Sequence, residues 1–237
     1  MEEHFENEAR SWIAWARTRD HDAYWYWRGC FFEEIVPEPG HRTLELGCGE
    51  GRVARDLTSR GHQVVGCDLS ETLLQAAAAA GNQQLVRANG ARLPLCDQSV
   101  DLVVAYNVLI DVDDLTGVIE EATRVLTRRG ILCACLPHPM ADVGAFSDGK
   151  HDAPFVIEQS YLETAPFAAT CTREDLTMTF RGWHRPLGAY TWAMEQTGLV
   201  IDRIREPPAP AAALVRWPDH GRWQRIPMFL HLRAQKV

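Results

Sequence analysis

A strand, a glycine-rich turn and a helix follow one another without a break in the stretch RTLELGCGEGRVARDL, which begins at Arg42. Residues 42–47 are predicted to form the strand, and the helix is expected to continue to about Ser59. The turn between them contains Gly47, Gly49 and Gly51. Such a turn presents free backbone N–H groups at the helix N-terminus, and glycines let a ligand approach that backbone closely. The stretch therefore predicts an α/β fold that holds a ligand against its main chain.

Strand-like and helix-like segments continue to alternate along the chain, which is typical of parallel strands covered by helices on both faces. Further strands are expected at 63–68, 84–89, 100–107, 131–137, 199–207 and 227–237, and helices at 71–81, at 186–198 and from Asp113 or Asp114 to Gly130. Ser70 is expected to cap the helix at 71–81. The segment 209–225 is expected to be a loop.

The chain of 237 residues is predicted to form a single domain, 1–237, made of four successive parts. Residues 1–40 are rich in aromatic side chains and are expected to form a helical cover. Residues 41–137 form the ligand-binding core. Residues 138–185 interrupt the alternation and are expected to form a lid. Its part at 138–176 is expected to be partly helical, because a long structureless loop is improbable in a compact domain, and the stretch TMTFRGWH at 177–184 is expected to be extended. Residues 186–237 supply the last helix and strands.

Composition excludes several classes of protein. The formal net charge of −8, from 32 acidic and 24 basic residues, argues against a non-specific nucleic-acid surface. No run of 18 apolar residues occurs, and the acidic start MEEHFENEAR is unlike a signal peptide, so no membrane span and a cytoplasmic protein are expected. Seven scattered cysteines are expected to be reduced, with Cys133 and Cys135 on one face of a strand and no metal site.

Polar residues follow the next two strands at the points where they end. Asp68 ends the strand at 63–68, 21 residues after Gly47, where a carboxylate can accept both hydroxyls of a ribose. Asn89 follows the third strand, and its amide can pair with the edge of an adenine. Because the carboxyl ends of parallel strands lie along one edge of a sheet, these residues and the glycine turn predict an adenosine site at that edge.

The glycine spacing separates this site from two other nucleotide sites. It is G-x-G-x-G, whereas the dinucleotide fingerprint is G-x-G-x-x-G, and the Gly-Lys-Ser/Thr ending of a phosphate-binding loop is absent. The sequence also shows no Tyr-x-x-x-Lys pair for hydride chemistry. A nicotinamide-dependent oxidoreductase is therefore the less favoured alternative.

Five segments resemble, in order and spacing, the successive motifs of the class I S-adenosylmethionine-dependent methyltransferases. They are LELGCGEG, VVGCDLS, ANGARLPL, DLVVAYNVLIDVDDL and VLTRRGILCACLP, which extend from Thr43 to Pro137. The resemblance is strongest to the small-molecule, ubiquinone/menaquinone-methyltransferase-like group. It implies a Rossmann-like, seven-stranded, mostly parallel sheet with an antiparallel last strand, helices on both faces, and a lid inserted after strand five. It also implies S-adenosyl-L-methionine as cofactor and S-adenosyl-L-homocysteine as product.

The resemblance also assigns residues to the cofactor. They are Glu45, Gly47, Cys48, Gly49 and Gly51 around the methionine part, Asp68 on the ribose, Leu69, Asn89, Gly90 and Ala91 around the adenine, and Tyr106 and Asn107 near the sulfonium. Two positions depart from the family. Asn89 replaces a common aspartate, and Ile110 with Asp111 stands where many relatives carry a histidine.

The N-terminal stretch SWIAWARTRDHDAYWYW is expected to cover the cofactor, with Trp15 and Tyr24 at its methionine end and Arg28 on its carboxylate. Ordinary packing of an aromatic helix on the sheet is the alternative for each of these residues. The residues expected to contact the methyl acceptor are Trp12, His21, Asp111 and Trp183. A closed cover would exclude water and strengthen electrostatic interactions inside the site.

Methyl transfer from a sulfonium is an in-line displacement that needs no metal and no covalent intermediate, while a base assists when the acceptor is a hydroxyl. His184 with Arg185 is the first candidate for this base, followed by His138 and His21. The expected reaction is methylation of a small organic acceptor, with oxygen favoured over nitrogen or carbon. A peptide or protein methyltransferase and a non-catalytic adenosyl-cofactor-binding partner protein remain alternatives, as do a monomer and a homodimer.

Overall fold

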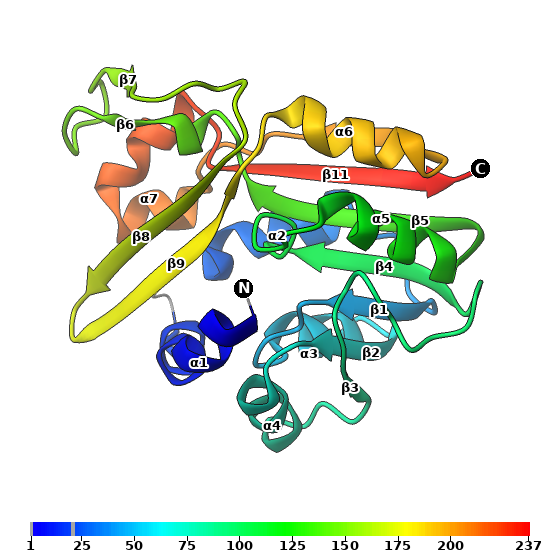
Figure 1. The fold of residues 1–237 in the computed structure, drawn as a ribbon. Coiled ribbons are helices and arrows are strands. Elements are labelled where there is room, and N and C mark those ends of the chain that lie inside the picture. The colour runs from blue at the N-terminus through cyan, green and yellow to red at the C-terminus, as the bar shows by residue number, and fades with distance from the viewer. Residues whose placement is uncertain (1, 20–21) are drawn as a thin grey trace.

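A seven-stranded sheet forms the centre of the computed structural model, which describes residues 2–19 and 22–237. The strand order is β10-β11-β5-β4-β1-β2-β3 (Figure 1). The strands are β1 Arg42–Leu46, β2 Gln63–Asp68, β3 Leu85–Arg87, β4 Val100–Tyr106, β5 Leu126–Pro137, β10 Leu199–Arg205 and β11 Phe229–Lys236. Neighbours run parallel except at β11, which is antiparallel to both β5 and β10. The predicted mostly parallel sheet with an antiparallel last strand is confirmed.

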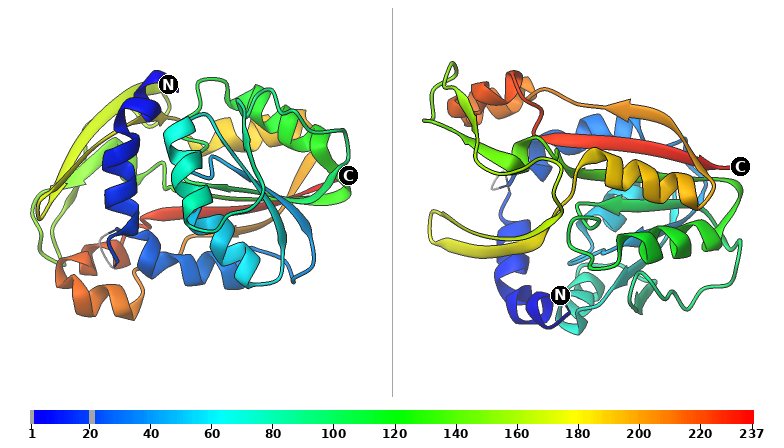
Figure 2. Two further views of the ribbon diagram at one scale, coloured as in Figure 1. Left: turned by 90° about the horizontal axis from the view of Figure 1, so that it is seen from below. Right: turned by 45° about the horizontal axis from the view of Figure 1, so that its top comes forward.

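Helices cover both faces of this sheet (Figure 2). They are α1 Glu2–Arg17, α2 Tyr24–Glu34, α3 Arg52–Ser59, α4 Glu71–Ala79, α5 Leu115–Val125, α6 Leu187–Gln196 and α7 Ala211–Arg216. On β4, Val103 and Ala105 pack in one core cluster with α5 and α6, whereas Leu102 and Val104 pack in a second with α2, α3 and α7. Because successive strand side chains point to opposite faces, a strand between two helical layers is apolar throughout.

Local capping explains where two of these helices begin. The Ser70 hydroxyl accepts a hydrogen bond from the Leu73 N–H at 3.1 Å, as the sequence predicted for this helix. The Asp114 carboxylate accepts one from the Gly117 N–H at 2.9 Å. Each cap satisfies an N–H group that has no partner within its own helix. Both helices therefore start next to the carboxyl ends of β2 and β4, where the predicted ligand site lies.

Two boundaries differ from the expected ones. Helix α5 ends at Val125, and β5 already begins at Leu126, so residues 126–130 belong to a strand rather than to the expected helix. Leu126 pairs with Val100 of β4, and this pairing makes the segment part of the sheet. The expected loop at 209–225 contains α7 and the 3-10 turn η2 (Pro218–Gln224). Its alanines favour a helix, and Ala213 is buried against the core beneath α2.

The insertion after β5 is built mainly from two antiparallel ribbons. The first pairs β6 (Gly144–Phe146) with β7 (Phe155–Ile157), and the second pairs β8 (Ala165–Arg173) with β9 (Leu176–His184). The extended stretch predicted at 177–184 is confirmed as part of β9, whereas the segment 138–176, expected to be partly helical, supplies the strands β6, β7 and β8. A short 3-10 turn, η1 (Ala141–Val143), precedes them. Cross-strand threonine pairs join β8 to β9, with hydroxyl oxygens 3.1 and 3.0 Å apart. Threonine is β-branched and favours this pairing.

The N-terminal helices divide into two roles. Helix α2 packs in the core on one face of the sheet, with Trp27 and Phe31 fully buried. Helix α1 instead lies between α4 and the β8–β9 ribbon, which projects beyond the sheet (Figures 1 and 2). In the part of the chain that the structure describes, no helix has the length and apolar character needed to cross a bilayer.

His231 on β11 links stability to pH. Its ring is fully buried beside Phe31, and neither ring nitrogen has a hydrogen-bond partner among the described residues. Burial lowers the pKa of His231 from 6.5 to about 4. The folded protein therefore keeps the ring neutral while the unfolded chain takes up a proton below pH 6.5. The stability that depends on the neutral ring is complete above that pH and is lost as the pH falls towards 4.

We predict that His231→Phe removes this dependence. Between about pH 7.5 and about pH 5, the wild-type free energy of unfolding should fall by about 2 kcal/mol more than that of the variant. Urea unfolding followed by tryptophan fluorescence measures both values. The other titrating groups are common to the two proteins, so the difference isolates His231. An equal fall in both proteins would contradict the assignment.

Candidate functional site

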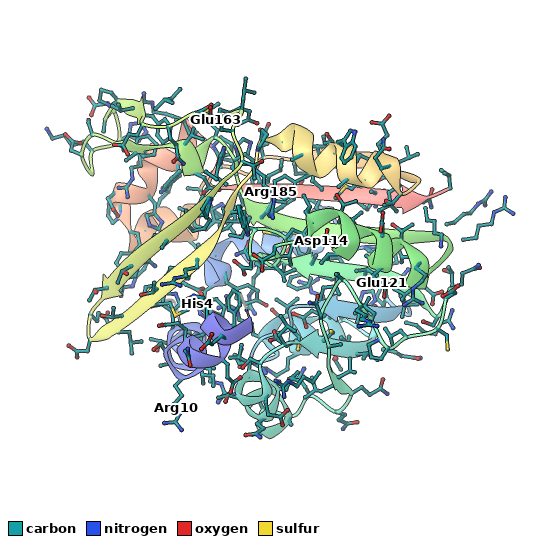
Figure 3. All side chains as sticks on the ribbon, viewed as in Figure 1. His4, Arg10, Asp114, Glu121, Glu163 and Arg185 are labelled. Atoms are coloured by element: carbon teal, nitrogen blue, oxygen red, sulfur yellow. The ribbon has the colours of Figure 1, made fainter. Side chains whose placement is uncertain are left out.

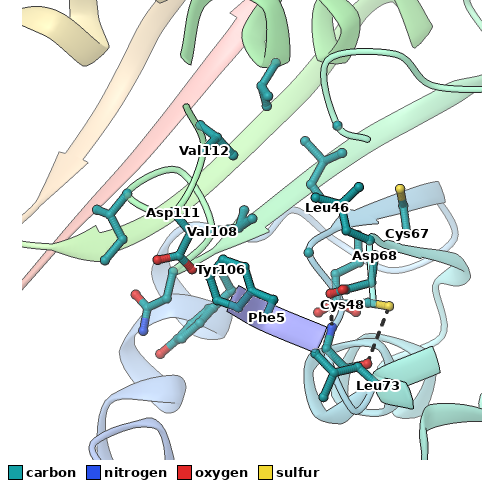
Figure 4. A pocket seen from close by; sticks show the side chains of 18 of the residues that line it. Phe5, Leu46, Cys48, Cys67, Asp68, Leu73, Tyr106, Val108, Asp111 and Val112 are labelled. Carbon is teal, nitrogen blue, oxygen red and sulfur yellow. Dashed lines mark hydrogen bonds between the residues drawn. The ribbon is translucent and has the colours of Figure 1, made fainter. Parts of the chain in front are cut away.

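A cavity of about 610 Å³ lies at the carboxyl ends of β1, β2 and β4. Its lining comes from the glycine turn, the ends of β2 and β3, the loop after β4, helix α1 and strand β9. In Figure 4, Asp68 and Asp111 lie on either side of Phe5 and Tyr106. The volume is within the range of pockets that hold organic ligands, and the place is the one where sheets of this type bind them.

The glycine turn brings bare backbone to the cavity wall. Gly47 and Gly49 have φ angles of +63° and +54°, in the left-handed region that favours glycine. A Cβ atom on Gly47 would lie 2.4 Å from Val108 Cγ2, and one on Gly49 would lie 3.1 Å from Trp12 Nε1. Side chains are therefore excluded at both positions for conformational and steric reasons. Gly51 begins α3 as its N-cap and lies outside the cavity lining.

Asp68 ties the glycine turn to the end of β2. Its Oδ2 accepts a hydrogen bond from the Gly49 N–H at 2.8 Å, and its Oδ1 accepts one from the Ser70 N–H at 2.9 Å. Burial raises the pKa of Asp68 despite these bonds. Glu45 is buried nearby, and burial together with the Asp68 charge raises its pKa well above its ordinary value. Two carboxyl groups thus face one end of the cavity, an arrangement suited to hydroxyl donors and to a cation.

The loop after β4 forms the opposite end. Asn107 has a φ of +58°, an unusual backbone for a residue other than glycine, and its N–H donates to the Cys135 carbonyl at 2.7 Å. The Tyr106 hydroxyl is buried without a hydrogen-bond partner among the described residues. Burial and the Asp68 charge raise the pKa of Asp111 well above its ordinary value, and Arg185 opposes them. The Tyr106 hydroxyl and the Asp111 carboxyl group therefore line this end of the cavity without a hydrogen bond from the described residues.

Helix α1 and strand β9 close the cavity with aromatic side chains. Phe5 and Trp12 come from α1, and Phe180 comes from β9, its ring edge-on to that of Trp12 at 6.4 Å between centroids. Arg52 is a cation in the lining. Its guanidinium lies 5.2 Å from the Trp12 ring, and its Nη1 is 2.7 Å from Asp22 Oδ2. The structure thus joins an apolar wall to a positive charge near the glycine turn.

Most of the residues predicted for the cofactor and the acceptor do line this cavity: Trp12, Glu45, Gly47, Cys48, Gly49, Asp68, Leu69, Asn89, Gly90, Ala91, Tyr106, Asn107 and Asp111. Others do not: Gly51, Trp15, Tyr24, Arg28, His138, Trp183, His184 and Arg185. His21 lies outside the described residues.

Three of the outlying residues are engaged elsewhere. Arg28, expected on the cofactor carboxylate, has its Nη1 2.7 Å from Asp56 Oδ2 on α3. His184 Nε2 lies 3.0 Å from the Tyr161 carbonyl oxygen, and His138 Nε2 lies 2.8 Å from a Glu206 carboxylate oxygen. Two of the three histidines expected to act as base, His184 and His138, are thus hydrogen-bonded to groups outside the cavity lining.

Arg185 and Trp183 instead support the loop after β4 from behind. Arg185 lies where β9 passes into α6 (Figure 3), and its guanidinium donates to the carbonyls of Leu109 at 3.1 Å and Val112 at 2.6 Å. The Trp183 indole N–H donates to Asp113 at 2.9 Å. These bonds fix the loop that presents Asp111 to the cavity.

Sequence reasoning missed several residues of the lining: Phe5, Arg52, Val108, Phe167, Met178, Phe180 and Arg181. Arg52 had a local signal, because it follows the glycine turn directly and opens the next helix. Met178 and Phe180 are two residues apart on β9 and so share a face. No sequence motif indicates that the β8–β9 ribbon reaches the cavity at the edge of the sheet.

The sheet order, the glycine turn and Asp68 together define an α/β domain built to hold an adenosyl cofactor at the carboxyl edge of its sheet. The family model described as "Methyltransferase domain" matches residues 44–134. A crystal structure of an S-adenosylmethionine-dependent methyltransferase from Mesorhizobium loti is 25% identical with a TM-score of 0.74, covering 92% of this chain and 99% of that one.

Curated relatives agree with this match. A probable S-adenosylmethionine-dependent methyltransferase from Mycobacterium tuberculosis is 33% identical over 138 residues, 57% of this chain and 48% of the relative. A demethylmenaquinone methyltransferase from Corynebacterium kroppenstedtii is 31% identical over 109 residues, 46% of this chain and 47% of the relative. The chain spans about half the length of these relatives. Residues 44–134 thus match a methyltransferase domain, and the chain is similar in sequence and fold to S-adenosylmethionine-dependent methyltransferases.

The glycine turn gives a direct test of the site. Gly47→Ala adds a methyl group at a left-handed φ and within 2.4 Å of Val108 Cγ2. The affinity for S-adenosylhomocysteine should fall by about tenfold or more, because strain of about 1–2 kcal/mol falls on the backbone that faces the ligand. Isothermal titration calorimetry measures this affinity.

Gly188→Ala is the matched control. Gly188 lies in α6 with open space where a Cβ would stand, so alanine should leave the affinity unchanged and raise helix stability slightly. Equal affinities of the wild-type protein and Gly47→Ala would show that the turn does not contact this ligand.

Proposed function

We propose that the protein transfers the methyl group of S-adenosylmethionine to a small organic acceptor, with a hydroxyl oxygen favoured over nitrogen or carbon. The observation that carries the proposal is the single cavity in which the glycine turn, Asp68 and an aromatic wall meet. The demethylmenaquinone methyltransferase among the relatives supports a small, ring-containing acceptor.

The residues of the cavity fit the cofactor. Each Asp68 oxygen accepts one backbone N–H, which leaves lone pairs for the two hydroxyls of a ribose. Asn89 and Leu69 line the part suited to adenine. A Cβ atom on Gly47 would clash with the Val108 side chain, so this position of the cavity wall requires glycine. S-adenosylmethionine supplies an activated methyl group when it is bound.

Arg52 takes the role that the sequence suggested for Arg28. It lines the cavity beside the glycine turn, while Arg28 lies outside the lining and pairs with Asp56. A guanidinium at this end suits the carboxylate of the methionine part, because charge-assisted hydrogen bonds of this kind are strong and directional. Asp22, which bonds Arg52, fixes its orientation.

The acceptor end combines apolar rings with acidic charge. The apolar lining of the cavity includes Ile110, Phe167, Met178 and Phe180, and Trp12 adds a ring at the glycine turn. The carboxyl groups of the whole cavity are Glu45, Glu50, Asp68, Asp111, Asp113 and Asp114, against the cations Arg52 and Arg181. This balance favours a cationic cofactor and a neutral acceptor over an anionic one, because like charges repel strongly in a partly buried site. An aromatic hydroxyl compound meets both conditions.

Two assays test the proposal. S-adenosylhomocysteine should bind in calorimetry whereas NADH should not, which separates a methyltransferase from an oxidoreductase. Methyl-labelled S-adenosylmethionine should transfer its label to at least one member of a panel of phenols and hydroquinones. Binding without transfer to these compounds, to amines or to peptides would favour the non-catalytic partner protein, and transfer to peptides alone would favour a peptide methyltransferase.

The two arginines give a sharper prediction. Arg52→Met should lower the affinity for S-adenosylhomocysteine by about tenfold, equivalent to loss of one charge-assisted hydrogen bond. Its affinity for 5′-methylthioadenosine, which has no carboxylate, should change by less than about twofold. Arg28→Met should leave both affinities unchanged. Calorimetry with the two ligands checks all three proteins, and loss of both ligands in Arg52→Met would instead indicate a disturbed turn.

A further inference from the structure

Asp111 is a carboxyl group of the cavity that receives no hydrogen bond from the described residues; Glu45, at the Asp68 end, also has one buried oxygen, Oε2, without a partner. Asp68 accepts two backbone N–H groups, Asp113 holds Trp183, and Asp114 caps α5. Among the described residues, no group donates a hydrogen bond to the Asp111 carboxylate, although its side chain lines the cavity. Its own N–H closes a tight turn onto the Val108 carbonyl at 2.9 Å, so the backbone beneath it is fixed.

The charged and titratable groups around Asp111 come from several elements. Asp68 acts on it from the end of β2, and Arg185 acts from the junction of β9 and α6. Tyr190 of α6 also interacts with it, and Tyr106 from β4 and Asp113 from its own loop line the same cavity. The Arg185 guanidinium is occupied by backbone carbonyls, so it attracts the carboxylate without bonding it. Asp111 is therefore held in protein with its oxygens free for a ligand.

We propose that Asp111 pairs with the sulfonium of the cofactor and accepts the proton of the acceptor hydroxyl. This inference rests on the proposed function and names a proton acceptor within the cavity. Asp68, Arg52 and Asp111 line one cavity, so a cofactor held by its ribose at Asp68 and by its carboxylate at Arg52 would have its sulfur in the cavity that Asp111 also lines. Asp111 shares the cavity lining with the aromatic rings of Trp12 and Phe180, and its carboxylate accepts no hydrogen bond from the described residues.

Atoms and charges balance in a methyl transfer that involves only the sulfonium, the acceptor hydroxyl and Asp111. One S–C bond breaks and its electron pair stays on sulfur, one C–O bond forms, and the hydroxyl proton passes to an Asp111 oxygen. The sulfonium and the carboxylate are both neutral afterwards. Removing a buried pair of charges in this way avoids leaving either one unpaired, which would be costly in low dielectric. The proton returns to solvent at the latest when the next S-adenosylmethionine binds.

A binding signature follows from the charge of the cofactor. Burial and Asp68 raise the pKa of Asp111 in the free protein, so the group holds a proton over a range in which an exposed carboxyl has lost it. A sulfonium beside it lowers that pKa, so the cation should bind with release of a proton. S-adenosylhomocysteine carries no sulfonium and should not cause this release.

The experiment is calorimetric titration of wild-type protein and Asp111→Asn in phosphate and in Tris, whose ionisation enthalpies differ. We expect S-adenosylmethionine to release a measurable fraction of a proton from the wild-type protein and none beyond the ligand's own contribution from Asp111→Asn. The affinity of the variant for S-adenosylmethionine should fall by about tenfold at about pH 8, with that for S-adenosylhomocysteine within about twofold. The ligand's own amine contributes equally to both proteins.

Asp113→Asn is the matched control, since it removes a carboxylate from the same loop and keeps an amide oxygen for Trp183. It should retain the wild-type proton release. Equal release and equal affinity ratios in wild type and Asp111→Asn would overturn the role of Asp111 while leaving the proposed function intact. Failure of the wild-type protein to bind either adenosyl compound would overturn the proposed function itself.

Discussion

The hydrogen bond from the Gly49 N–H to the Asp68 carboxylate is the interaction on which the cavity depends. It joins the turn after β1 to the end of β2, which are neighbouring strands. Because the carboxylate is half-buried and lines the cavity, these donors stabilise it, and the turn reaches it through left-handed glycines. The backbone shape and the carboxylate position are therefore determined together, and neither is a local property of its own segment.

Hydrogen bonds connect Asp68 through Ser70 to the N-terminal helix α1. Ser70, whose N–H bonds Asp68, donates its hydroxyl to Glu6 of α1 at 2.6 Å. At the other end of α1, Arg17 pairs at 3.0 Å with Glu50, which is 1% exposed and belongs to the glycine turn. Between these ends, Trp12 meets the ribbon. Helix α1 is thus attached to the rim of the ligand site rather than to the core, whereas α2 is a true core helix.

The sheet and the glycine turn were predictable because their signals are local. Apolar runs such as that of β4 are buried on both faces, and Gly47 and Asp68 stand at strand ends whose positions follow from the alternation of elements. In the insertion, the extended stretch at 177–184 was predictable from the sequence, but β6, β7 and β8 were not, since the apolar residues of 138–176 lack a clear period. The choice between Arg28 and Arg52 depended on how α2 turns against α3, which a single sequence does not display.

The position of β11 has a consequence for biosynthesis. This strand is the last in the sequence, yet it lies between β5 and β10 and supplies the hydrogen bonds of both. During translation β10 emerges with no neighbour to pair with, and β5 keeps one open edge, until the final strand leaves the ribosome. Open edges of this kind attract other chains. The nascent protein therefore passes through a stage in which its core is largely made but its sheet cannot close.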